Sequence, residues 1–403
     1  MKGKIFKTLS ALLITATLAA VSVMPALAAN YPTDKQATGG TPTFKKYFVV
    51  KQDVEFPSAV FEYTIVPGDA VAPTPTTMEV FPGPTGATVG TADFSAAPLA
   101  ADIYTTKQEG DVSLTLGADE KYAKKTVTID FTAVKFAEPG VYRYTLQEKQ
   151  CSNPAIACDT KEYSVDVYVI DTNGTLSVST YIIHLGTDAP ASTTGTTASK
   201  VDGKIDGITN RYPTTGLYFA KKVAGNQGSR DKYFKFTVAL TDLPAGTVLT
   251  VDVSNADATS GSNSATAEAN RGKANVTTLT ADATGKVSHD FYLQNDQYIA
   301  IYGLTEGSKY TVTEAAEDYE SADAETTAIT IGSKAFDDAT SGTMSDEDVY
   351  TGFTNTRQGV IPTGIIISAV PVIIIGIVVV AGIAFFAVRS AKRKASEADT
   401  EEQ

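Results

Sequence analysis

Apolar and polar residues alternate along most of the chain, in short runs separated by glycine, proline and aspartate. In the run VFEYTIV, Phe61, Tyr63 and Ile65 fall on one face and polar residues on the other. The runs KTVTIDF and YSVDVYVID have the same period of two and are rich in aromatic and β-branched residues. Many short strands of this kind, separated by turns, predict a β-sandwich. No amphipathic helix is convincing in the body of the chain, so the expected fold class is all-β.

The strand pattern begins again at about residue 212. Four stretches of the first half recur in the second half in the same order, and an internal repeat of this size predicts two similar domains in tandem. We expect β-sandwich domains at residues 29–211 and 212–358, with the boundary near Tyr212 and Pro213. The paired stretches are YFVVK and LYFAK, FEYTIV and FKFTVAL, YTLQE and YTVTE, and GITN and GFTN.

Residues 1–28 predict a secretory signal peptide. Three lysines precede a short apolar core, and a small-x-small cleavage site ends at Ala28. The apolar core is shorter than a membrane span requires, which disfavours the alternative of an uncleaved N-terminal anchor. We expect cleavage after Ala28, so the mature chain acts outside the cytoplasm.

A second apolar run, at residues 365–388, is long enough to span a bilayer. The tail at residues 389–403 begins with arginine and lysine and would stay in the cytoplasm under the positive-inside rule. Directly before the span stands VIPTG, in which the proline favours an extended backbone. The apolar run and its basic tail would suffice as a plain stop-transfer anchor. The placement of this motif directly before the span indicates a more specific function than anchoring. The motif consists of Val360, Ile361, Pro362, Thr363 and Gly364.

Composition excludes several functional classes. The chain has 403 residues and a formal net charge of −13, which argues against nucleic-acid binding because phosphates require a basic surface. Its two histidines, His184 and His289, stand alone in strand-like runs, and no HExxH, GxSxG or paired Cys–His arrangement is present. We therefore expect no enzyme activity, no metal site and no cofactor.

The two cysteines, Cys151 and Cys158, lie in the stretch CSNPAIAC. An extracellular location permits a disulfide between them, which we favour over a pair of free thiols. Their spacing is neither that of a CxxC motif nor that of a zinc site.

Each half places a lysine on its first strand, a glutamate on a middle strand and an asparagine on its last strand. All six stand in apolar strand contexts, where strict alternation directs some of them into the sandwich. A buried lysine or glutamate is costly unless it is paired or chemically altered. The candidates are Lys51, Glu148 and Asn210 in the first half, and Lys221, Glu314 and Asn355 in the second.

Such a trio can form a covalent bond. Burial disfavours the ammonium form of lysine and leaves a nucleophilic amine. A buried glutamic acid stays protonated, so it can polarise the asparagine carboxamide and shuttle protons. Attack of the amine on the asparagine side-chain carbon expels ammonia and leaves a Lys–Asn isopeptide bond, once per site. The alternative is six solvent-facing residues at strand ends, but the recurrence of the trio in both halves favours the bond.

Several short stretches together resemble a known family. They are VVKQ, FEYTI, YTLQE and ITN in the first half, AKKVAG, FKFTVAL, YTVTE and FTN in the second, and VIPTG with its tail. On these stretches the chain resembles the major shaft pilins of Gram-positive bacteria, of the two-domain type with one intramolecular isopeptide bond in each Ig-like domain. The resemblance covers nearly the whole mature chain. It implies a structural subunit of a cell-surface pilus and not an enzyme.

The resemblance also implies which residues react. Lys51 would bond to Asn210 with the help of Glu148, and Lys221 would bond to Asn355 with the help of Glu314. The choice of Lys221 leaves the adjacent Lys222 as an alternative, because neighbouring strand residues face opposite sides and only one can lie in the core.

The motif VIPTG is similar to the sorting motifs that sortase reads in shaft pilins. It departs from LPxTG because no residue separates proline from threonine, and it has Ile361 where valine is usual, which leaves the sortase class open. Sortase would cut after Thr363 and pass it to a lysine of the next subunit. Lys204 is expected to be that lysine from its spacing to Asn210, with Lys200 as the alternative.

The expected partners are therefore sortase, identical pilin subunits, ancillary pilins and host surface ligands, with peptidoglycan anchoring. The expected location is the cell wall, with the chain tethered to the membrane until sortase cuts it. A wall-anchored adhesin or minor pilin that binds a host or glycan ligand is the alternative. It would usually carry a further domain with a large insertion, and two compact domains fill this chain.

Overall fold

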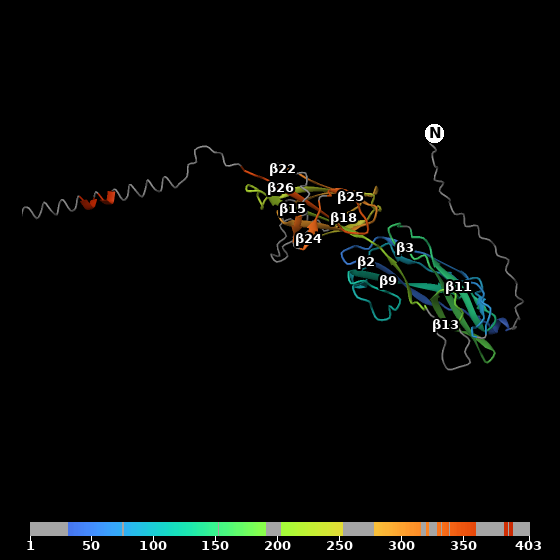
Figure 1. Ribbon diagram of the computed structural model, residues 1–403. Helices are drawn as coiled ribbons and strands as arrows, with labels where there is room; N and C mark the ends of the chain where they lie inside the picture. The colour runs from blue at the N-terminus through green and yellow to red at the C-terminus, as the bar shows by residue number, and fades with distance from the viewer. Residues whose placement is uncertain are drawn as a thin grey trace, which may run out of the picture.

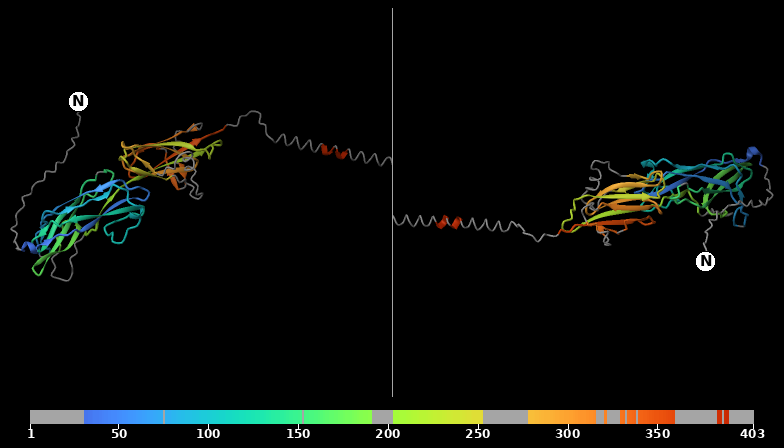
Figure 2. Two further views of the ribbon diagram at one scale, coloured as in Figure 1. Left: turned by 180° about the vertical axis from the view of Figure 1, so that it is seen from behind. Right: turned by 90° about the horizontal axis from the view of Figure 1, so that it is seen from above.

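The computed structural model contains two all-β bodies, which lie end to end (Figures 1 and 2). The chain passes from the first to the second through a short connection at residues 212–214. The structure describes residues 31–74, 76–151, 153–190, 203–252, 278–315, 320–321, 329–331, 333–337, 339–359, 383–385 and 387–389.

Two sheets form the first sandwich. One has the strand order β14-β2-β9-β6, with β8 also paired to β9, and the other has the order β13-β12-β11-β4, with β5 also paired to β11. Two short pairs, β1 with β10 and β3 with β7, complete the body. The bounds are β1 (Ala37–Thr38), β2 (Thr43–Lys51), β3 (Ala59–Phe61), β4 (Tyr63–Pro67), β5 (Val80–Pro82), β6 (Thr88–Val89), β7 (Ala92–Phe94), β8 (Ile103–Tyr104), β9 (Glu120–Asp130), β10 (Lys135–Phe136), β11 (Gly140–Glu148), β12 (Glu162–Thr172), β13 (Thr175–Leu185) and β14 (Gly207–Arg211).

Aromatic rings fill the space between these two sheets. The ring of Phe48 meets those of Phe56, Phe61 and Phe94 edge-on, with centroids 5.2–5.6 Å apart. Edge-to-face packing is the favoured geometry for aromatic pairs. The alternation along the strands thus builds the core, as the sequence pattern predicts.

Strand β2 is buried on both faces. Its inner face contributes to the main core, while Tyr47 and Val49 on its outer face pack with Leu114 and Tyr122 in a second apolar cluster. The loop at residues 105–119 supplies Leu114 and covers this outer face. Five consecutive residues of β2 are therefore buried, so the two faces cannot be told apart by polarity alone.

The second sandwich pairs a sheet of order β18-β17-β20-β15-β26-β22 with a sheet of order β19-β16-β21-β25. A hairpin of β23 and β24 covers the outer face of the first of these sheets, where Phe336 packs near Tyr350 and Tyr298. The bounds are β15 (Thr215–Ala224), β16 (Phe234–Thr241), β17 (Val248–Asp252), β18 (Thr278–Thr280), β19 (Val287–Leu293), β20 (Gln297–Leu304), β21 (Lys309–Glu314), β22 (Glu320–Ser321), β23 (Ile329–Ile331), β24 (Lys334–Phe336), β25 (Ser341–Thr343) and β26 (Val349–Thr356).

In each sandwich the first long strand pairs in parallel with the last strand. The pair is β2 with β14 in the first body and β15 with β26 in the second. Tyr212 follows β14 directly, is buried, and donates its backbone N–H to the carbonyl oxygen of Val49 at 2.9 Å. The chain therefore leaves one terminal strand and soon enters the next.

The predicted targeting segments lie almost wholly outside the described residues. These are the signal peptide at residues 1–28, the motif at residues 360–364 and most of the span at residues 365–388. Within the described ranges, no helix is both long enough and apolar enough to cross a bilayer.

Candidate functional site

A lysine, a glutamate and an asparagine meet inside the first sandwich. Glu148, at the end of β11, faces Lys46 on β2 and Asn210 on β14 across the core. The Nζ atom of Lys46 donates to Glu148 Oε2, and the Nδ2 atom of Asn210 donates to Glu148 Oε1. Lys46 and Asn210 are both 0% exposed, and the Lys46 amine also lies 4.4 Å from the ring centroid of Phe61.

The lysine of this cluster is Lys46, so the expectation for Lys51 is wrong. Lys46 shares the inner face of β2 with Phe48 and Val50, whereas Lys51 has the opposite parity. Lys51 stands at the strand end opposite Glu120 and lines a cleft at the domain junction. Because both faces of β2 are buried, the sequence pattern does not show which of its lysines faces the core. The match of YFVVK to LYFAK therefore selected the wrong lysine.

The second sandwich holds an equivalent cluster. The Nζ atom of Lys221 lies 2.8 Å from Glu314 Oε1, and Asn355 Nδ2 donates to the same oxygen at 2.8 Å. Lys221 is fully buried, while Lys222 is 41% exposed at its side chain and pairs with Asp296 on the surface. The structure therefore places Lys221, and not Lys222, beside the glutamate.

The two clusters share one register. Lys46 lies opposite Ile208, two residues before Asn210, and Lys221 lies opposite Phe353, two residues before Asn355. In both cases the glutamate comes from the end of a strand in the facing sheet.

Burial changes the proton affinity of both pairs. It lowers the pKa of Lys46 and of Lys221 to about 8, although the neighbouring carboxylate opposes the change. It raises the pKa of Glu148 and of Glu314, again against the influence of the partner lysine. The pKa values of amine and carboxyl thus approach each other, which favours transfer of a proton between them.

A disulfide joins Cys151 and Cys158 beside the first cluster. Its Cys151 sulfur lies 3.5 Å from Asn210 Nδ2 and 3.7 Å from Glu148 Oε1. Glu148 and the two sulfurs lie within 4.8 Å of one another, but disulfide sulfurs lack the thiolate charge that metal ligation requires.

Directly after the disulfide, the backbone N–H of Asp159 donates to Asn210 Oδ1 at 3.1 Å. Sequence reasoning missed this contact, because a backbone donor in a loop has no residue signature.

Lys204 is exposed and sits on a backbone segment held at both sides. The N–H of Leu185 donates to the carbonyl of Gly203 at 3.0 Å, and the N–H of Ile205 donates to that of Ile183 at 2.9 Å. Lys204 therefore extends from a short strand-like segment just before β14. The alternative, Lys200, lies outside the described residues.

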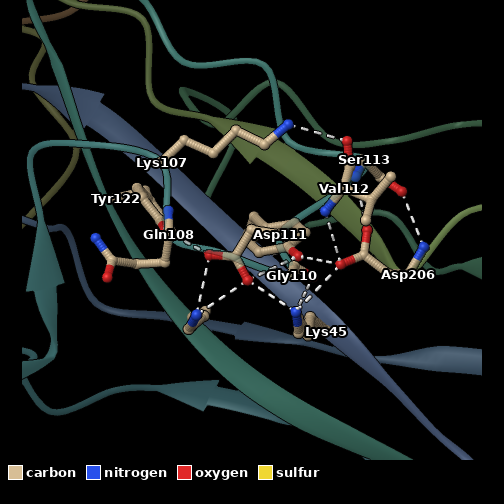
Figure 3. Close-up of polar contacts among 11 residues, drawn as sticks. Lys45, Lys107, Gln108, Gly110, Asp111, Val112, Ser113, Tyr122 and Asp206 are labelled. Carbon is tan, nitrogen blue, oxygen red and sulfur yellow. Dashed lines mark hydrogen bonds and ion pairs between the residues drawn. The ribbon is translucent and has the colours of Figure 1, made fainter.

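Asp206, two residues after Lys204, anchors this segment (Figure 3). Its carboxylate accepts the N–H groups of Val112 and Ser113 at 3.1 and 2.6 Å and the Tyr47 hydroxyl at 2.7 Å, and pairs with Lys45 at 3.2 Å. Burial opposes ionisation of Asp206, but these donors outweigh it and lower its pKa. In the same view the Asp111 carboxylate accepts hydrogen bonds from the Lys45 amine and the Tyr122 hydroxyl.

His184 belongs to a structural cluster. It is fully buried, and its Nε2 atom lies 3.1 Å from the Asp166 carboxylate, which Arg143 also binds through Nε and Nη2. Arg143 Nη1 in turn donates to the carbonyl of Thr187. The cluster holds the segment after β13, in keeping with a packed histidine.

Two family models match the chain, one in each sandwich. Residues 58–197 match the Spy0128-like isopeptide containing domain, and residues 215–357 match a domain of unknown function, DUF7601. A protein named Pilin, from Streptococcus pyogenes serotype M1, is 29% identical over 274 residues, which is 65% of this chain and 71% of that protein.

The solved structures that match the chain include two major pilins. That of the major pilin from Streptococcus pyogenes is 20% identical, covers 80% of this chain and 100% of its own, and has a TM-score of 0.43. The structure of the major pilin T3.2 from Streptococcus pyogenes serotype GAS13637 is 22% identical in sequence. Its match covers 80% of this chain and 99% of that chain, also with a TM-score of 0.43. The first sandwich is thus similar in sequence to the Spy0128-like isopeptide containing domain, and 65% of the chain is similar in sequence to a streptococcal pilin.

Proposed function

We propose that this protein is the backbone subunit of a covalently polymerised cell-surface pilus. Each Ig-like sandwich forms one internal isopeptide bond, Lys46 to Asn210 in the first and Lys221 to Asn355 in the second. The observation that carries the proposal is the shared geometry of the two clusters. A buried lysine and a buried asparagine stand on adjacent terminal strands at one register, and a glutamate faces both from the opposite sheet.

The glutamate in this arrangement can transfer the proton that the reaction must move. The neutral amine attacks the asparagine Cγ atom, the protonated carboxyl gives its proton to the departing Nδ2, and the carboxylate takes one proton from Nζ as ammonia leaves. Glu148 contacts both the attacking and the departing nitrogen, so no movement of the side chain is needed. The rigid core supplies the effective concentration.

The position of the bond gives it a mechanical role. Tension along a filament would enter and leave each domain through its terminal strands, and both bonds cross between those strands. A covalent link there would carry the load in place of the hydrogen bonds of the sheet.

Polymerisation would use Thr363 of one subunit and Lys204 of the next. Sortase would cut between Thr363 and Gly364 and join Thr363 to Lys204 of the next subunit, releasing the membrane span. Support for Lys204 comes from its exposed amine on an anchored segment. The filament would then reach the cell wall through peptidoglycan anchoring.

Intact mass spectrometry of the ectodomain, residues 29–359, tests the internal bonds. After reduction of the disulfide, the wild type should be lighter than its sequence mass by two ammonia molecules. Lys46→Ala and Lys221→Ala should each restore one of them. A wild-type mass equal to the sequence mass contradicts the proposal.

A further inference from the structure

The loop that the Cys151–Cys158 disulfide closes, together with Asp159 directly after it, takes part in the first cluster and has no described equivalent in the second. We propose that the backbone N–H of Asp159 is the oxyanion donor for the first isopeptide bond, and that the disulfide holds it in place. This inference rests on the proposed Lys46–Asn210 bond.

The carboxamide of Asn210 forms hydrogen bonds with two different partners, one at its nitrogen and one at its oxygen. Its Nδ2 donates to Glu148, while its Oδ1 accepts the Asp159 N–H at 3.1 Å. Negative charge develops on Oδ1 when the amine adds to Cγ, and Glu148 faces the nitrogen side of the group. A fixed N–H aimed at the developing oxyanion stabilises that state more than the starting amide.

Three attachments fix the donor. The N–H of Ala157 donates to the carbonyl of Arg211 at 2.8 Å, directly after Asn210 on β14. The disulfide ties Cys158 to Cys151, which follows Glu148 by three residues. The Asp159 carboxylate accepts the N–H of Lys161 at 2.8 Å and the hydroxyl of Tyr163 at 2.7 Å.

These contacts assign each atom a part in the reaction. The bond from Lys46 Nζ to Asn210 Cγ forms, and the bond from Cγ to Nδ2 breaks. Glu148 gives its proton to Nδ2, which leaves as ammonia, and takes one proton from Nζ. The N–H of Asp159 keeps its proton and only stabilises the charge on Oδ1.

The second cluster provides an internal control. Among the described residues, none donates a hydrogen bond to Asn355 Oδ1, and Glu314 contacts lysine and asparagine through the single oxygen Oε1. Both cysteines lie in the first sandwich. Changes at the loop should therefore slow the first bond and leave the second unaffected.

The test follows bond formation in ectodomain that is recovered in denaturant, shown by mass to be uncross-linked, and refolded. Samples are quenched at intervals and digested, and the cross-linked peptide of each domain is quantified by mass spectrometry. Asp159→Pro removes the N–H and should slow the first bond by roughly 10²-fold. Asp159→Asn keeps the N–H but removes the carboxylate charge that acts on Lys46 and Glu148, so it serves as the reference, and the first bond should form far faster in it than in Asp159→Pro.

A second comparison does not depend on the folding of the proline variant. Wild type refolded with dithiothreitol, and the double variant Cys151→Ser and Cys158→Ser, should form the first bond more slowly than oxidised wild type, with an unchanged second bond. The dependence of the first rate on pH should keep its shape, because a backbone N–H does not titrate. A loop that merely shields the cluster would instead shift that profile as the Lys46 and Glu148 pair became solvated.

Equal first-bond rates in oxidised and reduced protein would overturn the inference and leave the bond itself intact. Absence of the first bond from oxidised wild type would refute the proposed function instead.

Discussion

Lys46 and Asn210 lie on adjacent parallel strands, with Lys46 opposite the residue two positions before Asn210. Both side chains point into the core, and Glu148 faces them from the other sheet. The first and last strands of the domain therefore bring an amine and a carboxamide together in a dry environment. In the second sandwich Lys221 and Asn355 have the same relationship on adjacent parallel strands.

The intact mass of ectodomain variants can decide whether Lys46 or Lys51 of β2 forms the first isopeptide bond. Lys46→Ala should restore one ammonia mass to the ectodomain, because the attacking amine is lost. Lys51→Ala is the matched control on the same strand and should keep the full deficit of two ammonia molecules relative to its own sequence mass, since Lys51 lies at the domain junction. The opposite pattern would return the role to Lys51.

Each glutamate should serve only its own domain. Glu148→Ala should prevent the first bond and leave the second, and Glu314→Ala should do the reverse, because each carboxyl contacts one lysine and one asparagine. Peptide mapping distinguishes the two. Glu62→Ala, an exposed residue paired with Lys149, is the control and should form both bonds. Loss of both bonds in a single-site variant would indicate general misfolding.

The rate of bond formation should have an optimum in pH. Below the pKa of Glu148, which burial raises, the pair carries two protons and the amine stays charged. Above the pKa of Lys46, at about 8, the pair loses the proton that must leave with ammonia. The rate should therefore fall on both sides of the interval between these two pKa values. Refolding uncross-linked protein across a pH series measures it, and a rate that keeps rising above pH 8 would show that no proton donor is needed.

Removing the first bond should lower stability markedly. Closing a loop of about 160 residues, from Lys46 to Asn210, restricts the unfolded chain by about 5 kcal/mol. Asn210→Ala leaves the Lys46 and Glu148 pair in place but cannot form the bond, so it should unfold at a clearly lower urea concentration. Thr209→Ala, on the other face of β14, is the control. An Asn210→Ala protein that resists urea as well as wild type does would mean that the bond adds no stability.

The linking lysine can be tested in the cell wall. Lys204→Ala should abolish the ladder of high-mass species in wall extracts, because sortase would lose the amine that accepts Thr363. Lys149→Ala removes another exposed lysine of the same domain and should preserve the ladder. A ladder that persists in Lys204→Ala would transfer the role to Lys200.

The sequence alone sufficed for the coarse architecture. Alternation in runs such as VFEYTIV predicts strands because one face must be apolar and the other wet, and the repeated stretches predict two related sandwiches. Asn210, Glu148, Lys221, Glu314 and Asn355 could be chosen because a polar residue in an apolar strand is costly without a partner.

Only the tertiary structure decided which lysine of β2 reaches the core. Strand parity selects Lys46 over Lys51, but parity is legible from sequence only where one face is polar, and the loop at residues 105–119 buries the outer face as well. Likewise the donor to Asn210 Oδ1 is a backbone N–H, which every residue but proline has. Its role depends on where the Cys151–Cys158 loop docks against β14, and that placement arises from contacts between segments distant in the chain.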